Sequence, residues 1–462
     1  MSERVPDFGQ LDQAEVGSIV RVRSVADIKA ALTSASRQNC PIVLVGLQRS
    51  QGGHIAHPKA IALDMTGFNK VHSFDPKKLS VRVQAGATWN QIQQKLNPHG
   101  FSLVTMQSSC DFTVGGSISS NIHGRDIRHS SIAGSIRELS VMLADGEVVT
   151  TSPDKKPELF NLIVGGLGLF GVILEAELDI APDVLYEEHT ERIAVAELPK
   201  FFADLDTREP MIEMAMARPS IAPGHFLRDA LVTTWRRTEH ETAELPIQTL
   251  GEETHVFRDR LFFGLSRRYG WGKSLRWFLE ATVGTPVGKS RLVSRNNAMR
   301  PPIAPLAAFL NHSPRHSDHT QEFFIPVANF NTFIERADAV LKETDTNVLA
   351  VTVRFIKGHP EPFLNYTHGT DRLAVMMQLN DPLDNQGRAA SFRAIRRLVD
   401  AAISCDGCSY LTYALQPTAE QLTTMYPDLP RFLKLKQKYD PDSRFTTNFY
   451  RRLIGNDRFP VW

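Results

Sequence analysis

The feature that most constrains this fold is the glycine-rich stretch from Cys110 to Thr150. Gly115 and Gly116 are adjacent there, and small hydroxylated residues separate them from His123. Glycine lets backbone N–H groups approach a ligand closely, and successive N–H groups of this kind form an anion-binding concavity. The stretch therefore predicts a phosphate-binding loop in which His123 is the titratable group. An irregular surface turn is the alternative interpretation.

The same stretch ends in a predicted β-hairpin. An apolar run from Leu139 to Leu143 is followed by Asp145-Gly146 and then by a second apolar run. An Asp-Gly pair between two such runs is the strongest short-range signal for a hairpin. We therefore expect two antiparallel strands directly after the loop.

Similar units occur towards the N-terminus, where strands, glycine-rich loops and helices alternate. A second strand-to-glycine-loop unit runs from Pro41 through Gly46, Gly52 and Gly53. Several loops of this type indicate an α+β arrangement in which backbone segments converge on one ligand. The expected elements are a helix over Ser24–Ser36, strands at Pro41–Val45, Ile61–Asp64 and Ser80–Gln84, and a helix with N-cap Thr88 that ends at Leu96.

A third glycine-rich segment contains G-x-G-x-x-G at Gly166, Gly168 and Gly171. In a dinucleotide-binding fold, this motif follows a strand and opens a helix. Here a helix-like segment precedes the motif, and the alternating strand Val172–Ile180 follows it. The order of elements therefore argues against a nicotinamide site.

Composition narrows the class of protein. The chain has 462 residues, 42% hydrophobic and 22% charged, with a net charge of +1. These values are typical of a globular protein with two or three domain-sized units. A net charge this small does not indicate the positive electrostatic field that attracts nucleic acid. The first ten residues are polar, and the most apolar run, Leu162–Leu174, is too short to span a bilayer. We therefore expect a cytoplasmic protein without an integral membrane segment.

Beyond Pro182 the pattern changes to long alternating segments interleaved with helices. This pattern predicts an antiparallel sheet with helices on one side. The expected strands are Met211–Ala217, Thr320–Pro326, Val348–Ile356 and Leu373–Leu379, and the expected helices are Val327–Lys342 and Ala389–Cys405.

Two features of this region have open interpretations. Cys405 and Cys408 form a lone C-x-x-C, which is too few ligands for zinc, so we assign it to the end of the helix with Gly407 as C-cap. Residues 256–300 are basic and aromatic. A solvated basic face backed by packed aromatics is favoured over a membrane-surface or phosphosubstrate patch.

The chain resembles the vanillyl-alcohol-oxidase-type (PCMH-type) FAD-linked oxidoreductases. The resemblance rests on the three glycine-rich segments and on the sequences ADGEVV and GGLGLFGVI. The chain is similar to alditol oxidase, gulonolactone oxidase and decaprenylphosphoryl-ribose oxidase. The segment Lys436–Leu453 resembles the family's closing segment. The resemblance implies a two-domain α+β fold, with an FAD-binding domain over 1–182 and 427–462 and a substrate domain over 183–426.

The resemblance also implies which residues hold FAD. In the family, the loops 46–53 and 113–124 hold the pyrophosphate, and residues 165–172 lie along the adenosine half. The expected FAD-binding residues are Gly46, Leu47, Arg49, Ser50, Gln51, Gly52, Gly53, Thr113, Val114, Gly115, Gly116, Ser119, Asn121, His123, Gly124, Gly168, Gly171, Val172 and Ile173.

The attachment of FAD is expected to be non-covalent. Several family members carry a flavin-linked histidine at the fourth position of the first loop, where this chain has Arg49. Arginine cannot form that bond. His54 is out of register and is interpreted as a loop residue, and Cys110 as an ordinary loop cysteine rather than a second attachment point.

The expected catalytic residues are His123, Tyr413, Arg354 and Gln321, with Glu322 beside Gln321 as a further candidate. The family places an active-site histidine at His123, and Arg354 resembles its substrate-binding arginine. Tyr413 stands where the ribose oxidase has a lysine, which makes a sugar-lipid substrate doubtful. For each residue the alternative is a buried polar group satisfied within the sheet.

The function implied is oxidation of an alcohol (CH–OH) of a polyol, sugar, lactone or related small molecule. A hydride goes to flavin N5, and a proton goes to His123 or Tyr413. The electron acceptor is O₂ or unknown. Two alternatives stay open: a flavin dehydrogenase or reductase with a quinone or protein acceptor, and a non-catalytic nucleotide-binding module.

Overall fold

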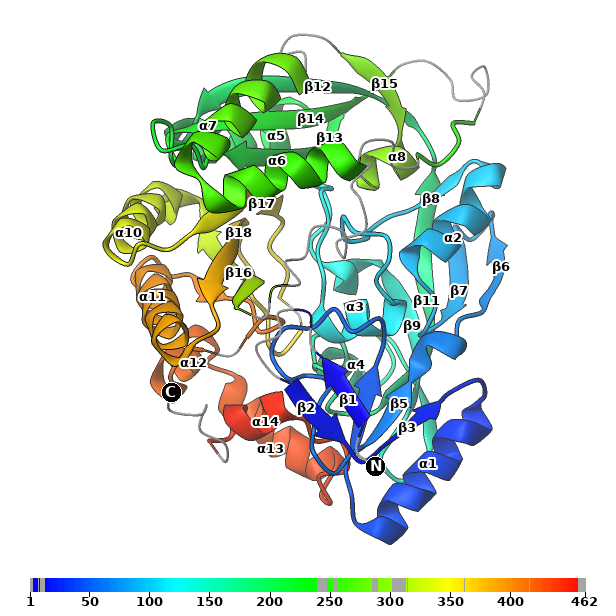
Figure 1. Cartoon of the computed structure of the whole chain (residues 1–462). Helices are drawn as coiled ribbons and strands as arrows, with labels where there is room; N and C mark the ends of the chain where they lie inside the picture. Colours follow the sequence, from blue (N-terminus) through cyan, green and yellow to red (C-terminus); the bar gives the residue numbers. More distant parts are fainter. Residues whose placement is uncertain are drawn as a thin grey trace.

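The computed structural model describes residues 3–6, 8, 13–238, 247–251, 256–284, 290–300, 313, 315–360, 362–414 and 416–455. Figure 1 shows two parts. The N-terminal domain contains the first strands and helices of the chain together with the last helices, and the central domain is built on an eight-stranded sheet. The combination of antiparallel sheets and helices confirms the expected α+β class with two domains.

Two sheets form the N-terminal domain, beside a small antiparallel pair. The first is parallel, in the order β3-β5-β4, and helix α1 packs on it. The second sheet includes β11, and β8 pairs with this strand. The elements are β1 (Glu3–Pro6), β2 (Gln13–Val16), β3 (Ser18–Arg21), α1 (Val25–Gln38), β4 (Ile42–Val45), β5 (Ile61–Asp64), β6 (Val71–Asp75), β7 (Ser80–Gln84), α2 (Trp89–Leu96), β8 (Phe101–Leu103), α3 (Val114–Ser120), β9 (Ile136–Met142), β10 (Val148–Thr151), α4 (Pro157–Ile163) and β11 (Val172–Pro182).

The local predictions for this domain agree with the structure except in the second glycine loop. The hairpin β9–β10 is antiparallel, and Gly146 in its turn has φ +86°. Thr88 caps α2 as expected. The expected loop from Thr113 to Gly124, however, contains helix α3, in which both glycines lie in the first turn. The adjacent glycines and small hydroxylated residues predicted a loop, but Val114 and Ile118, one turn apart, are both fully buried and hold the helix against the core.

The central domain contains an antiparallel sheet in the order β15-β12-β14-β13-β17-β18-β16-β19. One face packs against helices: Phe323 of β16 contacts Phe333 of α10, and Phe202 of α5 stacks on Phe355 of β17. The elements are β12 (Leu185–Ala194), α5 (Leu198–Arg208), β13 (Ile212–Pro219), β14 (Asp229–Arg237), α6 (Val256–Arg268), α7 (Gly270–Leu279), β15 (Arg291–Ser294), α8 (Arg295–Met299), β16 (His316–Pro326), α10 (Phe330–Glu343), β17 (Val348–Ile356), β18 (Arg372–Pro382), α11 (Asn385–Ile403), β19 (Cys408–Ser409) and α12 (Ala419–Met425).

The other face of this sheet is turned towards the N-terminal domain. Along it, alternate residues of neighbouring strands are partly exposed, although the residues between them are buried. Because successive side chains of a strand point to opposite faces, this alternation marks a surface that protein does not fully cover. We call it the open strip; its partly exposed residues are Met216, Thr233, Thr320, Ala350, Arg354, Met376 and Gln378.

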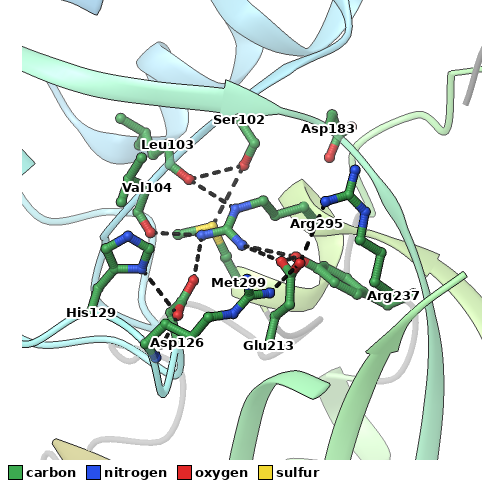
Figure 2. A network of polar contacts seen from close by, with 12 residues as sticks. Ser102, Leu103, Val104, Asp126, His129, Asp183, Glu213, Arg237, Arg295 and Met299 are labelled. Carbon is green, nitrogen blue, oxygen red and sulfur yellow. Dashed lines mark hydrogen bonds and ion pairs between the residues drawn. The ribbon is translucent and has the colours of Figure 1, made fainter. Parts of the chain in front are cut away.

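A buried ionic network joins the two domains (Figure 2). Arg295 of α8 is 3% exposed and donates to Asp126 at 2.8 Å and to the carbonyl oxygen of Val104 at 2.8 Å. It also donates to the Tyr186 hydroxyl, which in turn donates to Glu213 of β13 at 2.6 Å. Buried charges are stable only when they are paired, so this network fixes the segment after His123 against the central sheet.

The chain returns to the N-terminal domain through α13 (Leu429–Tyr439) and α14 (Asn448–Leu453). Phe445 forms a parallel bridge with Ile42. The backbone N–H groups of Asn448 and Phe449 donate to the carbonyls of Ala56 and Gly53. The last described segment therefore packs directly on the first glycine loop, next to β1 and β2 in Figure 1.

Two expectations for the central domain need correction. The aromatics of the basic stretch are not all packed, since Tyr269 and Trp271 stack on each other while remaining 48% and 57% exposed. Residues 285–289 of that stretch lie outside the described residues. Helix α11 ends at Ile403, and the residue with positive φ behind it is Asp406 rather than Gly407.

No helix in the described ranges has the length and apolarity needed to cross a membrane.

Candidate functional site

A cleft in the N-terminal domain lies where the glycine-rich segments meet. It holds about 760 Å³ of space, counted out to its open mouth, which is within the range for small-molecule sites. The first two loops touch at its base: a Cβ atom on Gly46 would lie 2.5 Å from Oγ1 of Thr113. Glycine at position 46 is therefore what allows the two loops to close on each other.

The structure brings about half of the sequence-predicted binding residues to this cleft. Those that line it are Gly46, Ser50, Thr113, Gly115, Gly116, Ser119, Gly168, Val172 and Ile173. Those outside its lining are Leu47, Arg49, Gln51, Gly52, Gly53, Val114, Asn121, His123, Gly124 and Gly171.

Several residues of the second group have protein contacts that explain their positions. Arg49 forms an ion pair with Asp111 at 2.7 Å. Gln51 accepts a hydrogen bond from the backbone N–H of Thr320. A Cβ on Gly52 would lie 2.7 Å from the carbonyl oxygen of Tyr413. The first loop thus connects to the central domain as well as to the cleft.

Sequence reasoning missed other residues that line the cleft: Leu44, His54, Ile55, Met65, Ala85, Ser120, Leu167, Thr412 and Thr447. His54 was interpreted as an ordinary loop residue. It stacks on Phe449 at 4.1 Å, and its Nε2 is 2.9 Å from the carbonyl oxygen of Leu411. Burial lowers the pKa of His54 to about 4, so the ring is neutral at pH 7. The contributions of Thr412 and Thr447 depend on the chain's return and had no local signal.

The cleft contains polar atoms that other described residues leave without a partner. Ser50 Oγ and His54 Nδ1 are buried and make no hydrogen bond within the described part of the chain. Buried polar groups are normally satisfied, so these two atoms indicate a polar ligand. The lining also includes Gly115 and Gly116 in the first turn of α3; the N–H of Gly115 donates to the carbonyl oxygen of Ala85, and Gly116 leaves space beside that turn.

Beyond the cleft, three titratable side chains from distant parts of the chain meet at one carboxylate. Nε2 of His123 is 3.1 Å from Oε1 of Glu322, and the Tyr413 hydroxyl donates to Oε2 of Glu322 at 3.4 Å. The side chains of His123 and Glu322 are only 2% and 3% exposed. Tyr413 is partly exposed. The tyrosine is therefore the outer member of this cluster, and the histidine lies behind the carboxylate.

The charge states of the cluster follow from its contacts. Burial raises the pKa of Glu322, but His123, Arg354 and the Tyr413 hydroxyl outweigh burial and bring that pKa below its usual value. Burial and the neighbouring carboxylate raise the pKa of Tyr413 well above its usual value. At neutral pH the cluster thus contains an ionised Glu322 and a protonated Tyr413 that donates to it.

The remaining expected catalytic residues are divided between the two faces of the sheet. Glu322 pairs with Met376, and Met376 pairs with Thr352, two residues before Arg354. Arg354 therefore lies on the open strip, on the same face as Glu322. Gln321 lies on the opposite face, with Phe323 and the helices, so it does not join the cluster. Tyr413 lies outside the strands, in the irregular segment after β19.

Comparison with known proteins gives two family matches and several relatives. Residues 17–152 match the FAD binding domain model, and residues 284–453 match the D-arabinono-1,4-lactone oxidase model. Cytokinin dehydrogenase 2 of Oryza sativa subsp. japonica is 31% identical over 38% of this chain and 34% of its own length. Decaprenylphosphoryl-beta-D-ribose oxidase of Mycolicibacterium smegmatis is 31% identical over 36% of this chain and 37% of its own length.

A longer match is to alditol oxidase of a Streptomyces species, which is 23% identical over 86% of both chains. The first two relatives are matched over about a third of their length. The first family match contains the first two glycine loops and part of the cleft lining. FAD fits this cleft, since Ser50 Oγ and His54 Nδ1 are buried polar atoms available to a polar ligand and Gly116 leaves space beside the first turn of α3.

Proposed function

We propose that this chain, which belongs to the vanillyl-alcohol-oxidase-type FAD-linked oxidoreductases, uses its FAD to oxidise a CH–OH group of a polyol, sugar, lactone or related small molecule. One observation carries the proposal: the cluster of Tyr413, Glu322 and His123 joins a segment of the cofactor domain to the open strip of the central sheet. A substrate on that strip would lie beside a proton acceptor and next to the cofactor domain.

When bound, FAD supplies the two-electron acceptor. The protein must take up the hydroxyl proton. Tyr413 is the partly exposed member of the cluster, and its phenol oxygen accepts the substrate proton while its own proton passes to the ionised Glu322. His123 holds the carboxylate in place from behind. Arg354, on the same face, orients the substrate oxygen atoms.

The test is anaerobic mixing of the purified, FAD-loaded protein with polyols, lactones and sugars. We expect bleaching of the oxidised flavin absorbance by at least one member of the panel, with one equivalent of FAD reduced per substrate oxidised. A protein that carries FAD and is bleached by dithionite but by no compound with a CH–OH group would contradict the proposal.

A second candidate function differs from the first in its electron acceptor. The names of the matched relatives include both oxidases and a dehydrogenase, which favours neither O₂ nor a quinone. Re-oxidation of the reduced enzyme with O₂ and with a soluble quinone distinguishes the two activities. A flavin re-oxidised much faster by the quinone assigns the chain as a dehydrogenase.

We further propose that FAD is held without a covalent bond. Arg49 occupies the attachment position and is engaged by Asp111. Acid precipitation should leave the yellow colour in the supernatant, and the absorbance ratio of supernatant to pellet measures it. A pellet that keeps flavin fluorescence would contradict this prediction. His54→Gln would then be the first variant to test for the attachment point, ahead of a variant of Cys110, because His54 lines the cleft and its Nδ1 has no partner among the described residues.

A further inference from the structure

A buried arginine lies beside the open strip without a carboxylate partner. Arg125 is 7% exposed, and its guanidinium lies over the ring of Trp235 with its carbon 5.2 Å from the ring centroid. One nitrogen donates to the carbonyl oxygen of Ala298 at 2.8 Å. Nε has no hydrogen-bond partner within the described residues, and no ion pair of Arg125 occurs there. A buried charge without a counter-ion is costly, so the position calls for an explanation.

A second arginine whose Nε lacks a partner lies close by. Nε of Arg354 is buried and lacks a hydrogen-bond partner in the described ranges. The sheet register brings the two together. The carbonyl of Arg125 accepts from Ala215 of β13, and β13 pairs with β17 through Ala217 and Val353, the neighbour of Arg354.

The electrostatics agree with this geometry. Burial and the positive charges of Arg354 and Arg218 lower the pKa of Arg125 to about 9, although Glu188 acts in the opposite direction. Glu188 is already engaged by Trp235 and Arg291, so it does not neutralise Arg125 by contact. Arg354 also acts on Glu322 and Tyr413. The two cations thus extend from the proposed proton-accepting cluster across the open strip.

We infer that Arg125 and Arg354 form an anion subsite, and that the substrate carries a carboxylate or phosphate group in addition to the alcohol that is oxidised. Guanidinium groups bind both anions through paired N–H donors, and the two unpartnered Nε–H groups supply such donors. An anion would also relieve the repulsion between the two cations. The inference names the substrate class of the proposed oxidation and rests on it for the reaction, whereas binding of the anion can be measured by itself.

The experiment uses FAD-loaded enzyme and three probes on one carbon skeleton: neutral D-sorbitol, D-gluconate and D-sorbitol 6-phosphate. Calorimetric titration of the oxidised enzyme under anaerobic conditions gives the Kd of each. We expect at least one anion to bind about tenfold or more tightly than sorbitol, because charge-assisted hydrogen bonds are stronger than neutral ones. The carboxylate and phosphate probes decide which group the subsite accepts.

Variants test whether the two arginines cause the preference. Arg354→Met should abolish it, and this variant removes no hydrogen bond found within the described residues. Arg125→Met should do the same, although it also removes the bond to Ala298. The matched control is Arg192→Met, which removes an arginine lying over Trp277, 5.8 Å from the ring centroid, elsewhere on the sheet. That variant should keep the preference.

The outcomes separate this inference from the proposed function. Equal binding of all three probes, or an anion preference that survives in Arg354→Met, would overturn the subsite. A flavin that no alcohol in the panel reduces would count against the proposed oxidation, and the binding result in the oxidised enzyme would still stand for or against the subsite.

Discussion

Replacing Tyr413 by phenylalanine is expected to slow reduction of bound FAD by substrate on the order of a hundredfold or more, while FAD stays bound. The hydroxyl of Tyr413 is the partly exposed donor to the buried Glu322 carboxylate. Without it, the proton of the substrate has no path to Glu322. Rapid mixing under anaerobic conditions measures the rate, and the 450 nm absorbance per mole of protein measures FAD content.

A matched control is Tyr439→Phe. The Tyr439 hydroxyl also donates to a carboxylate, that of Glu158 at 3.0 Å, but it does so on α13, away from the cluster. This variant should reduce FAD at the wild-type rate. Glu322→Gln, which keeps the shape of the side chain but removes its charge, should be slowed like Tyr413→Phe. Unchanged flavin reduction in both Tyr413→Phe and Glu322→Gln would remove the cluster from the mechanism.

The second large effect is expected from Gly116→Val, which should weaken FAD binding roughly a hundredfold or more. Gly116 lines the cleft, and a Cβ there would meet only Oγ1 of Thr113, at 3.1 Å. The two methyl groups of valine would therefore occupy ligand space rather than press on the protein core. We expect the purified variant to contain little FAD and to remain folded.

The control for this variant is Gly264→Val in α6, another helical glycine with nothing within 4 Å of its Cβ position. It should retain FAD. Circular dichroism tests whether each variant is folded, and FAD released by heating is quantified by fluorescence. A folded Gly116→Val protein that retains one FAD per chain would refute the assignment of this cleft. Gly115→Val is unsuitable, since its Cβ would lie 2.9 Å from the Cβ of Ala85 and would disturb packing.

Much of the N-terminal domain could be predicted from the sequence because its signals are local. The strands Ile61–Asp64 and Ser80–Gln84 and the helix after Thr88 occur at the predicted residues. Alternation, capping and turn chemistry act over a few neighbours, so a short window of sequence contains them.

The sequence alone did not decide which residues meet. Segment 113–124 was predicted as a loop from its adjacent glycines and small hydroxylated residues, yet burial of Val114 and Ile118 holds residues 114–120 in a helix. Gln321 was the expected catalytic residue and Glu322, next to it, a further candidate; strand pairing turns Glu322 towards His123 and Gln321 towards the helices.

The same reason applies to the residues that the sequence analysis missed. His54 lines the cleft because the C-terminal segment places Phe449 on its ring. Arg125, which the sequence analysis did not name, is 229 positions by number from Arg354, which it did expect in the site. The contact between segment 125–129 and β13 brings the two to one face. Local patterns in the sequence determined the α+β class and the glycine-rich segments, about half of whose expected binding residues line the cleft. The tertiary structure decided the composition of the cluster and of the anion subsite, because burial and charge pairing depend on contacts between distant residues.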